Sequence, residues 1–284
     1  MKSVDIQPFS QKLKALAATR GPFCLGIDPT EELLQSWGLS QNITGLKKMC
    51  EIVIEAAGNR LALVKPQAAY FEQYGPEGFA ALRDLVQAFH QQETLVLFDG
   101  KRGDIGSTSL AYAKAYLGSN SPYQFDAMTV TAYLGFDAIK PILEYATQVG
   151  AGVFVVTRSS NVEGQEIQNA MIDKCCLADY IAEKISAFNL EYSQEAIGPV
   201  GAVMGATLKN VQETVRKLDN AFLLAPGIGY QGATMNDLIE NYQGAMGRII
   251  PSSSRAVLSH GPDIHSLSNE IERSCQESLV LNGT

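Results

Sequence analysis

Four charged residues with alternating sign stand out in the chain: Lys65, Asp99, Lys101 and Asp104. Asp99 and Lys101 follow an apolar run, residues 95–98, that is typical of a strand buried on both faces. Because alternate strand residues point to the same side, the side chains of Asp99 and Lys101 should project together. A carboxylate and an ammonium group at the tip of a buried strand can form a poised acid–base pair. An ion pair at the surface is the alternative for these two residues taken alone.

Two further charged residues also end apolar runs. Asp28 ends the run at residues 23–28, and Lys65 lies near the end of residues 61–66. Pro66 holds Lys65 in an extended conformation, which suits a strand end. Pro29 follows Asp28, so a helix cap is the alternative to a functional role for this carboxylate.

A glycine-rich segment and an arginine near the C-terminus predict a phosphate site. Residues 225–232 read APGIGYQG, and residues 252–255, after the next apolar run, read SSSR. Backbone N–H groups of such loops bind phosphate, Gln231 can donate a further hydrogen bond, and Arg255 can bind phosphate through two. A turn without a ligand is the alternative for residues 225–232 considered by themselves.

Apolar runs alternate with helical patterns along the chain, which predicts a parallel sheet. Eight such units favour a single closed (β/α)8 TIM barrel, while a doubly wound open sheet is the alternative. No G-x-G-x-x-G motif follows the first run to support the open sheet. The predicted strands are residues 23–28, 61–66, 95–98, 127–133, 152–158, 200–206, 222–229 and 248–251.

A barrel would bring all the candidate residues to one face. Active sites of such barrels lie at the carboxyl ends of the strands, where Asp28, Lys65, Asp99 and Lys101 are predicted to lie. Phosphate often binds between the loops after strands seven and eight, which are the segments 225–232 and 252–255. Residues 157–161, after the fifth strand, offer polar groups for the edge of a heterocycle.

We expect the barrel to occupy residues 1–284 as one domain. Phe9, Leu13 and Leu16 fall at helical spacing and predict an extra N-terminal helix within residues 1–20, packed outside the core. Residues 259–284 should form a C-terminal helix and tail.

Composition limits the partners. A net charge of −8 argues against a nucleic-acid or anionic membrane surface as partner. The five cysteines include no C-x-x-C pair, which favours a reducing cytoplasm. The sequence contains no apolar run of the roughly 18 residues that a membrane span needs and no signal peptide.

Metal binding is not expected either. The three histidines lie away from the predicted strand ends. Asp28, Asp99 and Asp104 are suitable ligands for Mg²⁺, but the interleaved lysines would already neutralise their charge.

The segment from Asp99 to Ile105 fits the D-x-K-x-x-D-I pattern of the orotidine 5′-phosphate decarboxylase family, and DGKRGDIGST resembles its longer-chain variety. The resemblance extends to LGID, VKPQAAYFE, TRSSN, APGIGYQG and SSSRAVL. It implies a (β/α)8 barrel without metal or cofactor, usually a homodimer with active sites at the subunit interface. Such an enzyme converts orotidine 5′-monophosphate to uridine 5′-monophosphate and CO₂, the last step of de novo synthesis of that nucleotide.

The resemblance also implies roles for the matching residues. Lys65, Asp99, Lys101 and Asp104 would form a catalytic charge array, in which Lys101 protonates the pyrimidine carbon that loses CO₂. Asp104 would reach the partner's site. The remaining residues would bind substrate: Asp28, Lys65 and the partner's Thr108 at the ribose, Ser160 at the pyrimidine edge, and Gly227, Gly229, Gln231 and Arg255 at the phosphate.

Three other functions fit parts of this pattern. A related barrel that acts on sugar phosphates shares the D-x-K-x-x-D element but needs Mg²⁺. An aldolase would form a Schiff base on Lys65 or Lys101. A nucleotide-binding barrel without activity is the third alternative, although a pure binder has no need of a carboxylate beside an anionic ligand.

Overall fold

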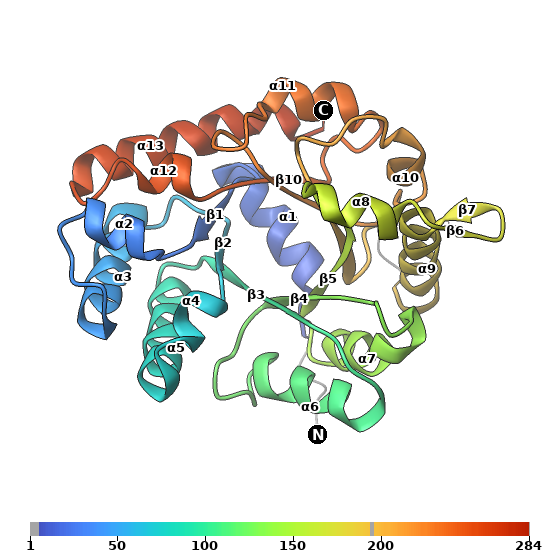
Figure 1. Ribbon diagram of the computed structural model, residues 1–284, viewed down its shortest axis with the longest axis horizontal. Helices are drawn as coiled ribbons and strands as arrows, with labels where there is room; N and C mark the ends of the chain where they lie inside the picture. Colours follow the sequence, from blue (N-terminus) through green and yellow to red (C-terminus); the bar gives the residue numbers. More distant parts are fainter. Residues whose placement is uncertain (1–5, 194–195, 284) are drawn as a thin grey trace.

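Eight short strands close into a parallel barrel in the computed structural model, which describes residues 6–193 and 196–283 (Figure 1). Each of the eight lies within or overlaps a predicted strand, so the (β/α)8 barrel is confirmed and the open sheet is wrong. The order around the barrel is β1, β2, β3, β4, β5, β8, β9 and β10, with β10 pairing back to β1. Their bounds are β1 Cys24–Ile27, β2 Leu63–Pro66, β3 Leu95–Arg102, β4 Ala127–Val130, β5 Gly152–Arg158, β8 Val200–Met204, β9 Leu223–Pro226 and β10 Ile249–Ser253.

Helices surround the barrel and bury the outer faces of its strands (Figure 1). The amphipathic α3, for example, turns Leu46, Met49 and Val53 toward the barrel core. None of the described helices is long and apolar enough to cross a membrane. The helices are α2 Glu31–Ser36, α3 Ile43–Ala57, α4 Ala69–Glu72, α5 Gly75–Gln91, α6 Gly106–Tyr116, α7 Lys140–Gln148, α8 Val162–Gln168, α9 Leu177–Tyr192, α10 Gln212–Arg216, α11 Met235–Asn241, α12 Arg255–Leu258 and α13 Ile264–Ser278, with 3₁₀ turns η1 Phe136–Ile139 and η2 Leu279–Leu281.

The extra N-terminal helix, α1 (Phe9–Arg20), closes one end of the barrel. Phe9 and Leu13 are buried among side chains from inside the barrel, and the Phe9 ring meets Phe154 edge to face, 6.0 Å between centroids. A side chain at Gly152 would collide with the Phe9 ring, so glycine makes room for it. The prediction that this helix packs outside the core is therefore wrong, because its apolar face covers the open end of the barrel interior. Residues 1–5 of the predicted helix lie outside the described residues.

The connection after β5 carries structure of its own, which the sequence did not reveal. It contains α8 and a small antiparallel hairpin of β6 (Met171–Ile172) and β7 (Cys175–Cys176). Arg158, at the end of β5, holds this segment in place by donating hydrogen bonds to Asn169 Oδ1 (2.9 Å) and Cys176 Sγ (3.0 Å). Arg158 therefore has a structural role on this side of the barrel.

Candidate active site

The carboxylate of Asp99 lies between two lysines at the ends of neighbouring strands. Lys65 on β2 donates to Asp99 Oδ2 over 2.6 Å, and Lys101 on β3 donates to Asp99 Oδ1, also over 2.6 Å. The side chains of Lys65 and Asp99 are only 8% and 7% exposed, whereas that of Lys101 is 45% exposed. The structure thus brings three of the four predicted array residues together, and Lys101 is the most exposed of the three.

These contacts fix the charge states of the buried pair. Burial alone would raise the pKa of Asp99, but the charges of Lys65 and Lys101 hold it well below its ordinary value. Burial would likewise lower the pKa of Lys65, but Asp99 and then Asp28 raise it above its ordinary value. Asp99 therefore stays ionised and Lys65 stays protonated over the neutral pH range.

The tip of β3 departs from regular strand geometry. Phe98 pairs with Met128 and Arg102 pairs with Val130, so the three residues between Phe98 and Arg102 lie opposite Thr129 alone. Lys101 has a φ of 44°, in the left-handed region that few residues other than glycine adopt. Strand alternation predicted that the side chains of Asp99 and Lys101 point to the same side. They do meet, but through a bulge in β3, a common feature next to active sites.

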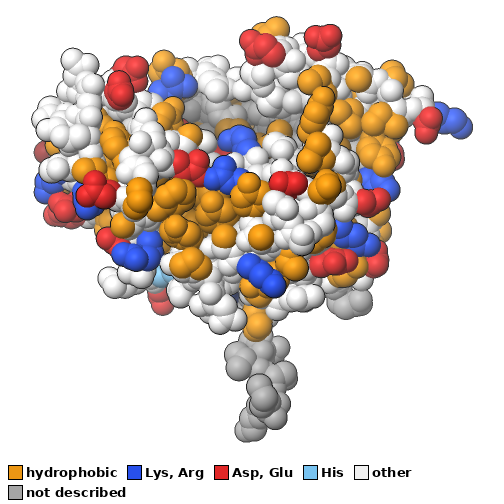
Figure 2. Space-filling view, turned by 60° about the horizontal axis from the view of Figure 1, so that its bottom comes forward, with side chains coloured by type: hydrophobic (Ala, Val, Ile, Leu, Met, Phe, Trp, Pro, Cys, Tyr) orange, Lys and Arg blue, Asp and Glu red, His pale blue; other side chains and the backbone are white. Residues whose placement is uncertain are grey.

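A polar cleft of about 90 Å³ lies beside this array. Its lining includes Asp28, Lys65, Gly227, Gln231 and Arg255, which come from the ends of β1, β2, β9 and β10. The space-filling view shows a hollow in the molecular surface in which basic and acidic side chains lie close together (Figure 2). Two of the predicted ribose residues, Asp28 and Lys65, thus share one cleft with Gly227, Gln231 and Arg255, which are predicted to bind phosphate.

Two buried polar atoms of this cleft have no hydrogen-bond partner among the described residues: Asp28 Oδ1 and Ser254 Oγ. Asp28 is not the cap of the following helix, because the N-cap of α2 is Thr30, whose hydroxyl accepts from the Leu33 N–H. Buried polar groups are rarely left unpaired, so these two atoms indicate a site prepared for a polar ligand.

The loops after β5 and β9 meet across the cleft. Ser160 Oγ donates to Gln231 Oε1 over 3.0 Å, whereas the Ser159 hydroxyl bonds within its own loop, to Asn161. Ser160 is therefore the serine that reaches the cleft side. The Arg255 guanidinium group lies over the Tyr230 ring, 3.6 Å from its centroid, a contact that the sequence analysis did not predict.

Gly227 and Gly229 shape the turn after β9, with φ values of 120° and 75° that disfavour other residues. Their N–H groups donate to Ser252 and Ala233 carbonyls, respectively. In this conformation the two N–H groups are therefore already used inside the fold. A side chain at position 227 would lie 2.8 Å from Gln231 Oε1, so the glycine leaves room for Gln231.

Asp104 and Thr108 lie apart from the array of their own chain. Asp104 Oδ1 accepts from the Ile105 N–H just before α6, and within residues 6–193 and 196–283 it forms no ion pair with Lys65 or Lys101. Thr108 is exposed on the first turn of α6. Their predicted roles at a partner's site stay predictions.

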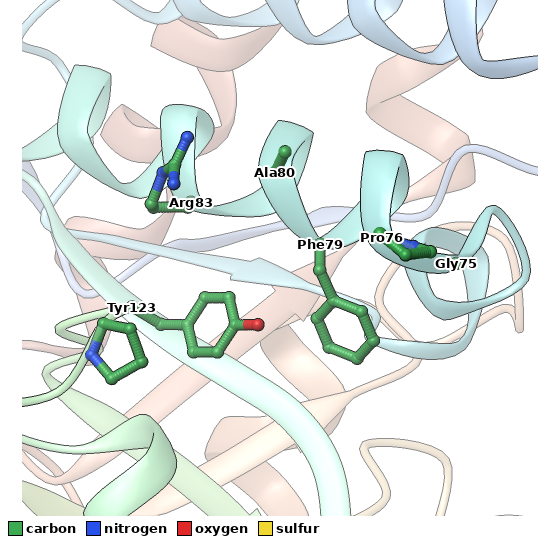
Figure 3. A pocket seen from close by; sticks show the side chains of 7 residues that line it. Gly75, Pro76, Phe79, Ala80, Arg83 and Tyr123 are labelled. Atoms are coloured by element: carbon green, nitrogen blue, oxygen red, sulfur yellow. The ribbon is translucent and has the colours of Figure 1, made fainter.

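One larger groove on the surface has fewer polar groups than this cleft. A larger groove of about 480 Å³ lies between α5 and the segment after α6, lined mainly by Pro76, Phe79, Ala80, Arg83 and Tyr123 (Figure 3). Among the described residues that line it, Arg83 alone is charged, so the smaller polar cleft is the better candidate for a reaction. In the part of the chain that the structure describes, no three His, Cys, Asp or Glu side chains gather where they could hold a metal ion.

Comparison with known proteins points to one family. Residues 21–266 match the family model described as orotidine 5′-phosphate decarboxylase / HUMPS family. An orotidine 5′-phosphate decarboxylase of Myxococcus xanthus is 46% identical over 280 residues, which covers 98% of this chain and 97% of the relative. One of Streptomyces coelicolor is 41% identical, covering 94% of this chain and 96% of the relative.

A solved structure agrees with these relatives. A crystal structure from Streptomyces avermitilis, assigned as an orotidine 5′-phosphate decarboxylase, superposes with a TM-score of 0.92 at 40% identity. The match covers 99% of this chain and 98% of that one. The similarity therefore includes the barrel, α1 and the C-terminal helix.

Asp99→Asn should destabilise the fold, because it leaves the buried ammonium group of Lys65 without its nearest counter-charge. Breaking a buried ion pair costs about 3 to 5 kcal/mol, and urea unfolding near neutral pH should reveal a loss of this size. The pair stabilises the fold below the ordinary lysine pKa of about 10.4 and loses its effect as the pH rises through the higher native pKa of Lys65. The difference in free energy of unfolding between wild type and Asp99→Asn should therefore become smaller in strongly alkaline solution.

Asp84→Asn is the matched control, since Asp84 is an exposed carboxylate on α5 that forms an ion pair with the adjacent Arg83. We expect it to change the free energy of unfolding by less than about 0.5 kcal/mol. Equal effects of the two substitutions would contradict the buried-pair interpretation.

Proposed function

Since the chain belongs to the orotidine 5′-phosphate decarboxylase / HUMPS family, we propose that it converts orotidine 5′-monophosphate to uridine 5′-monophosphate and CO₂ in pyrimidine biosynthesis. The observation that carries this proposal is the Lys65–Asp99–Lys101 array beside a polar cleft that contains Arg255 and Gln231. The lysines of the array provide fixed positive charge, and Arg255 and Gln231 can bind a phosphate. Together they suit a nucleotide that loses a carboxylate. We expect the enzyme to act in the cytoplasm.

The nucleotide would lie along the cleft. Arg255 and Gln231 would bind the phosphate, with Gly227 and Gly229 shaping the loop that presents Gln231. The unpaired Asp28 Oδ1 and the ammonium group of Lys65 would bind the ribose hydroxyls. Ser160 would meet the pyrimidine edge, and its hydroxyl also donates to Gln231 over 3.0 Å.

Loss of CO₂ breaks the bond between the ring carbon and the carboxylate, and the electron pair stays on the ring carbon. This carbanion-like centre has little resonance stabilisation, so fixed charge must stabilise it. Lys101 Nζ would supply positive charge next to that carbon and then donate a proton to it. Asp99 would hold both lysines in place and lie next to the departing carboxylate, and the neutral Lys101 would regain its proton from solvent.

The array also favours this reaction over the alternatives. Both oxygens of Asp99 already accept from ammonium groups, which supports a reaction without a metal ion or another cofactor. A Schiff base requires a neutral amine, and the raised pKa of Lys65 argues against that role for it. Among the alternatives, the sugar-phosphate barrel that uses Mg²⁺ differs in its metal requirement and can be separated by a chelator.

We propose further that the enzyme is a homodimer with shared active sites. The loops after β3 and β4 expose three large apolar side chains, Ile105 (61%), Tyr133 (80%) and Leu134 (59%). Ile105 follows Asp104 directly. A second subunit bound at this surface would therefore have its cleft close to Asp104 and Thr108 of the first subunit. Exposed apolar side chains at this position support a subunit contact.

The reaction is tested by the ultraviolet absorbance of orotidine 5′-monophosphate mixed with the protein and excess EDTA. We expect loss of the orotate chromophore as uridine 5′-monophosphate appears.

Lys101→Ala should lower kcat by roughly 10²- to 10⁴-fold or more, since it removes both the charge and the proton donor. Arg255→Ala should mainly raise KM, by roughly 10- to 100-fold, because it removes a charged contact to phosphate.

Lys47→Ala, an exposed lysine on α3, serves as the control and should leave both constants unchanged. Near-normal turnover of Lys101→Ala would end the mechanistic assignment. An activity that disappears with EDTA and returns with Mg²⁺ would favour the sugar-phosphate type of barrel.

Shared active sites can be tested by mixing two inactive variants. Lys101→Ala and Asp104→Ala should each be inactive, but a mixed dimer contains one site without either substitution. Equal amounts should recover about one quarter of wild-type activity, because half of the dimers are mixed and half of their sites are intact. The mixture of Lys101→Ala with Lys65→Ala is the control and should stay inactive, since both lysines contact the same Asp99. Absence of recovery in the first mixture would place Asp104 in its own chain's site or outside any site.

A further inference from the structure

Thr129, on β4, occupies a position that the array depends on. Its neighbours Met128 and Val130 pair with Phe98 and Arg102, so Thr129 alone faces the bulge formed by residues 99–101. It is 1% exposed, although it is polar and lies within an apolar strand. We infer that Thr129 is a positioning residue, which holds Asp99 and Lys101 in the geometry that the reaction requires.

The hydrogen bonds of its hydroxyl group determine this role. The Lys101 N–H donates to Thr129 Oγ1 over 2.9 Å, and Thr129 Oγ1 lies 2.9 Å from Asp99 Oδ1. An N–H group can only donate, so the hydroxyl is the acceptor toward Lys101. Its single proton is then directed to the ionised carboxylate of Asp99, which can only accept. One side chain thus joins the backbone of the proton donor to the carboxylate between the two lysines.

The bulge explains why a side chain is needed there. In a regular strand pair, the Lys101 N–H would donate to a carbonyl group of β4. The shifted register takes it away from that ladder, and the left-handed φ of Lys101 must be kept by other contacts. The Thr129 hydroxyl replaces the missing carbonyl group. Lys101 is the least buried member of the array, so its position depends on this backbone contact and on Asp99.

The inference rests on the proposed decarboxylation, and it is tested by Thr129→Val, which keeps the side-chain shape but removes the hydroxyl group. With orotidine 5′-monophosphate as substrate, kcat should fall by roughly 10- to 100-fold, as expected when a reacting group shifts by about 1 Å. KM should change less than about threefold, because Thr129 does not line the phosphate end of the cleft. Thr129→Ser retains the hydroxyl group, so its kcat should stay within about threefold of the wild-type value.

Thr94→Val controls for general damage to the barrel. Thr94 precedes β3, is also 1% exposed, and donates its hydroxyl to the Leu61 carbonyl far from the cleft. We expect it to lower the unfolding temperature by a similar amount to Thr129→Val but to leave kcat unchanged. An unchanged kcat in Thr129→Val, equal losses in Thr94→Val, or failure of Thr129→Ser to restore kcat would each overturn the inference.

Amide hydrogen exchange at Lys101 provides a measurement that does not depend on turnover. The Lys101 N–H should be protected in the wild type and in Thr129→Ser, and should exchange faster in Thr129→Val. If the wild type does not decarboxylate the substrate but shows this exchange pattern, the proposed reaction fails while the positioning contact holds. If Lys101 exchanges equally in all three proteins, the positioning role is wrong whether or not the enzyme is active.

Discussion

A carboxylate and two ammonium groups meet within hydrogen-bond distance at the mouth of an apolar barrel, and this cluster constrains the structure around it. An isolated buried charge would cost several kcal/mol, so the buried groups of Lys65 and Asp99 are acceptable only because they are paired. Asp99 uses both of its oxygens for the lysines and accepts a further bond from Thr129. The electrostatic environment that would stabilise a carbanion is therefore already assembled before a substrate binds, which is the condition under which fixed charges are most effective.

The barrel supplies what this cluster needs. Lys65 and Asp99 lie on neighbouring strands and are themselves buried, so their side chains have little freedom to move. At the opposite end of the barrel, α1 excludes water from the interior with Phe9 and Leu13. A sheet left open at that end would expose the apolar residues that hold the strands in register, so the helix contributes indirectly to the rigidity of the site.

Much of this arrangement could be predicted from the sequence, because it depends on local patterns. The eight strands follow from apolar runs between helical segments, and the barrel rule then places Asp28, Lys65, Asp99 and Lys101 at one face. The bulge at residues 99–101 could not be predicted, since register depends on contacts between strands that are distant in sequence. Thr129 was missed for the same reason: a single polar residue inside an apolar run is a weak signal until its partner strand is known. The position of α1 and the hairpin after β5 likewise depend on tertiary packing.

The residues proposed to bind phosphate and the residues proposed to react come from different parts of the barrel. Gln231 lies on the loop after β9 and Arg255 begins α12, whereas Asp99 and Lys101 lie on β3. The groups proposed to bind phosphate therefore come from other elements than the groups proposed to react. Binding energy from a remote phosphate can accelerate the reaction only if it is used to hold the base against the array. The Ser160–Gln231 hydrogen bond offers such a link, because it joins the loop proposed to meet the pyrimidine edge to the loop proposed to bind phosphate. A ligand that engages Gln231 would thereby also set the position of Ser160, and the rigid bulge held by Thr129 would present Lys101 to a base placed in this way.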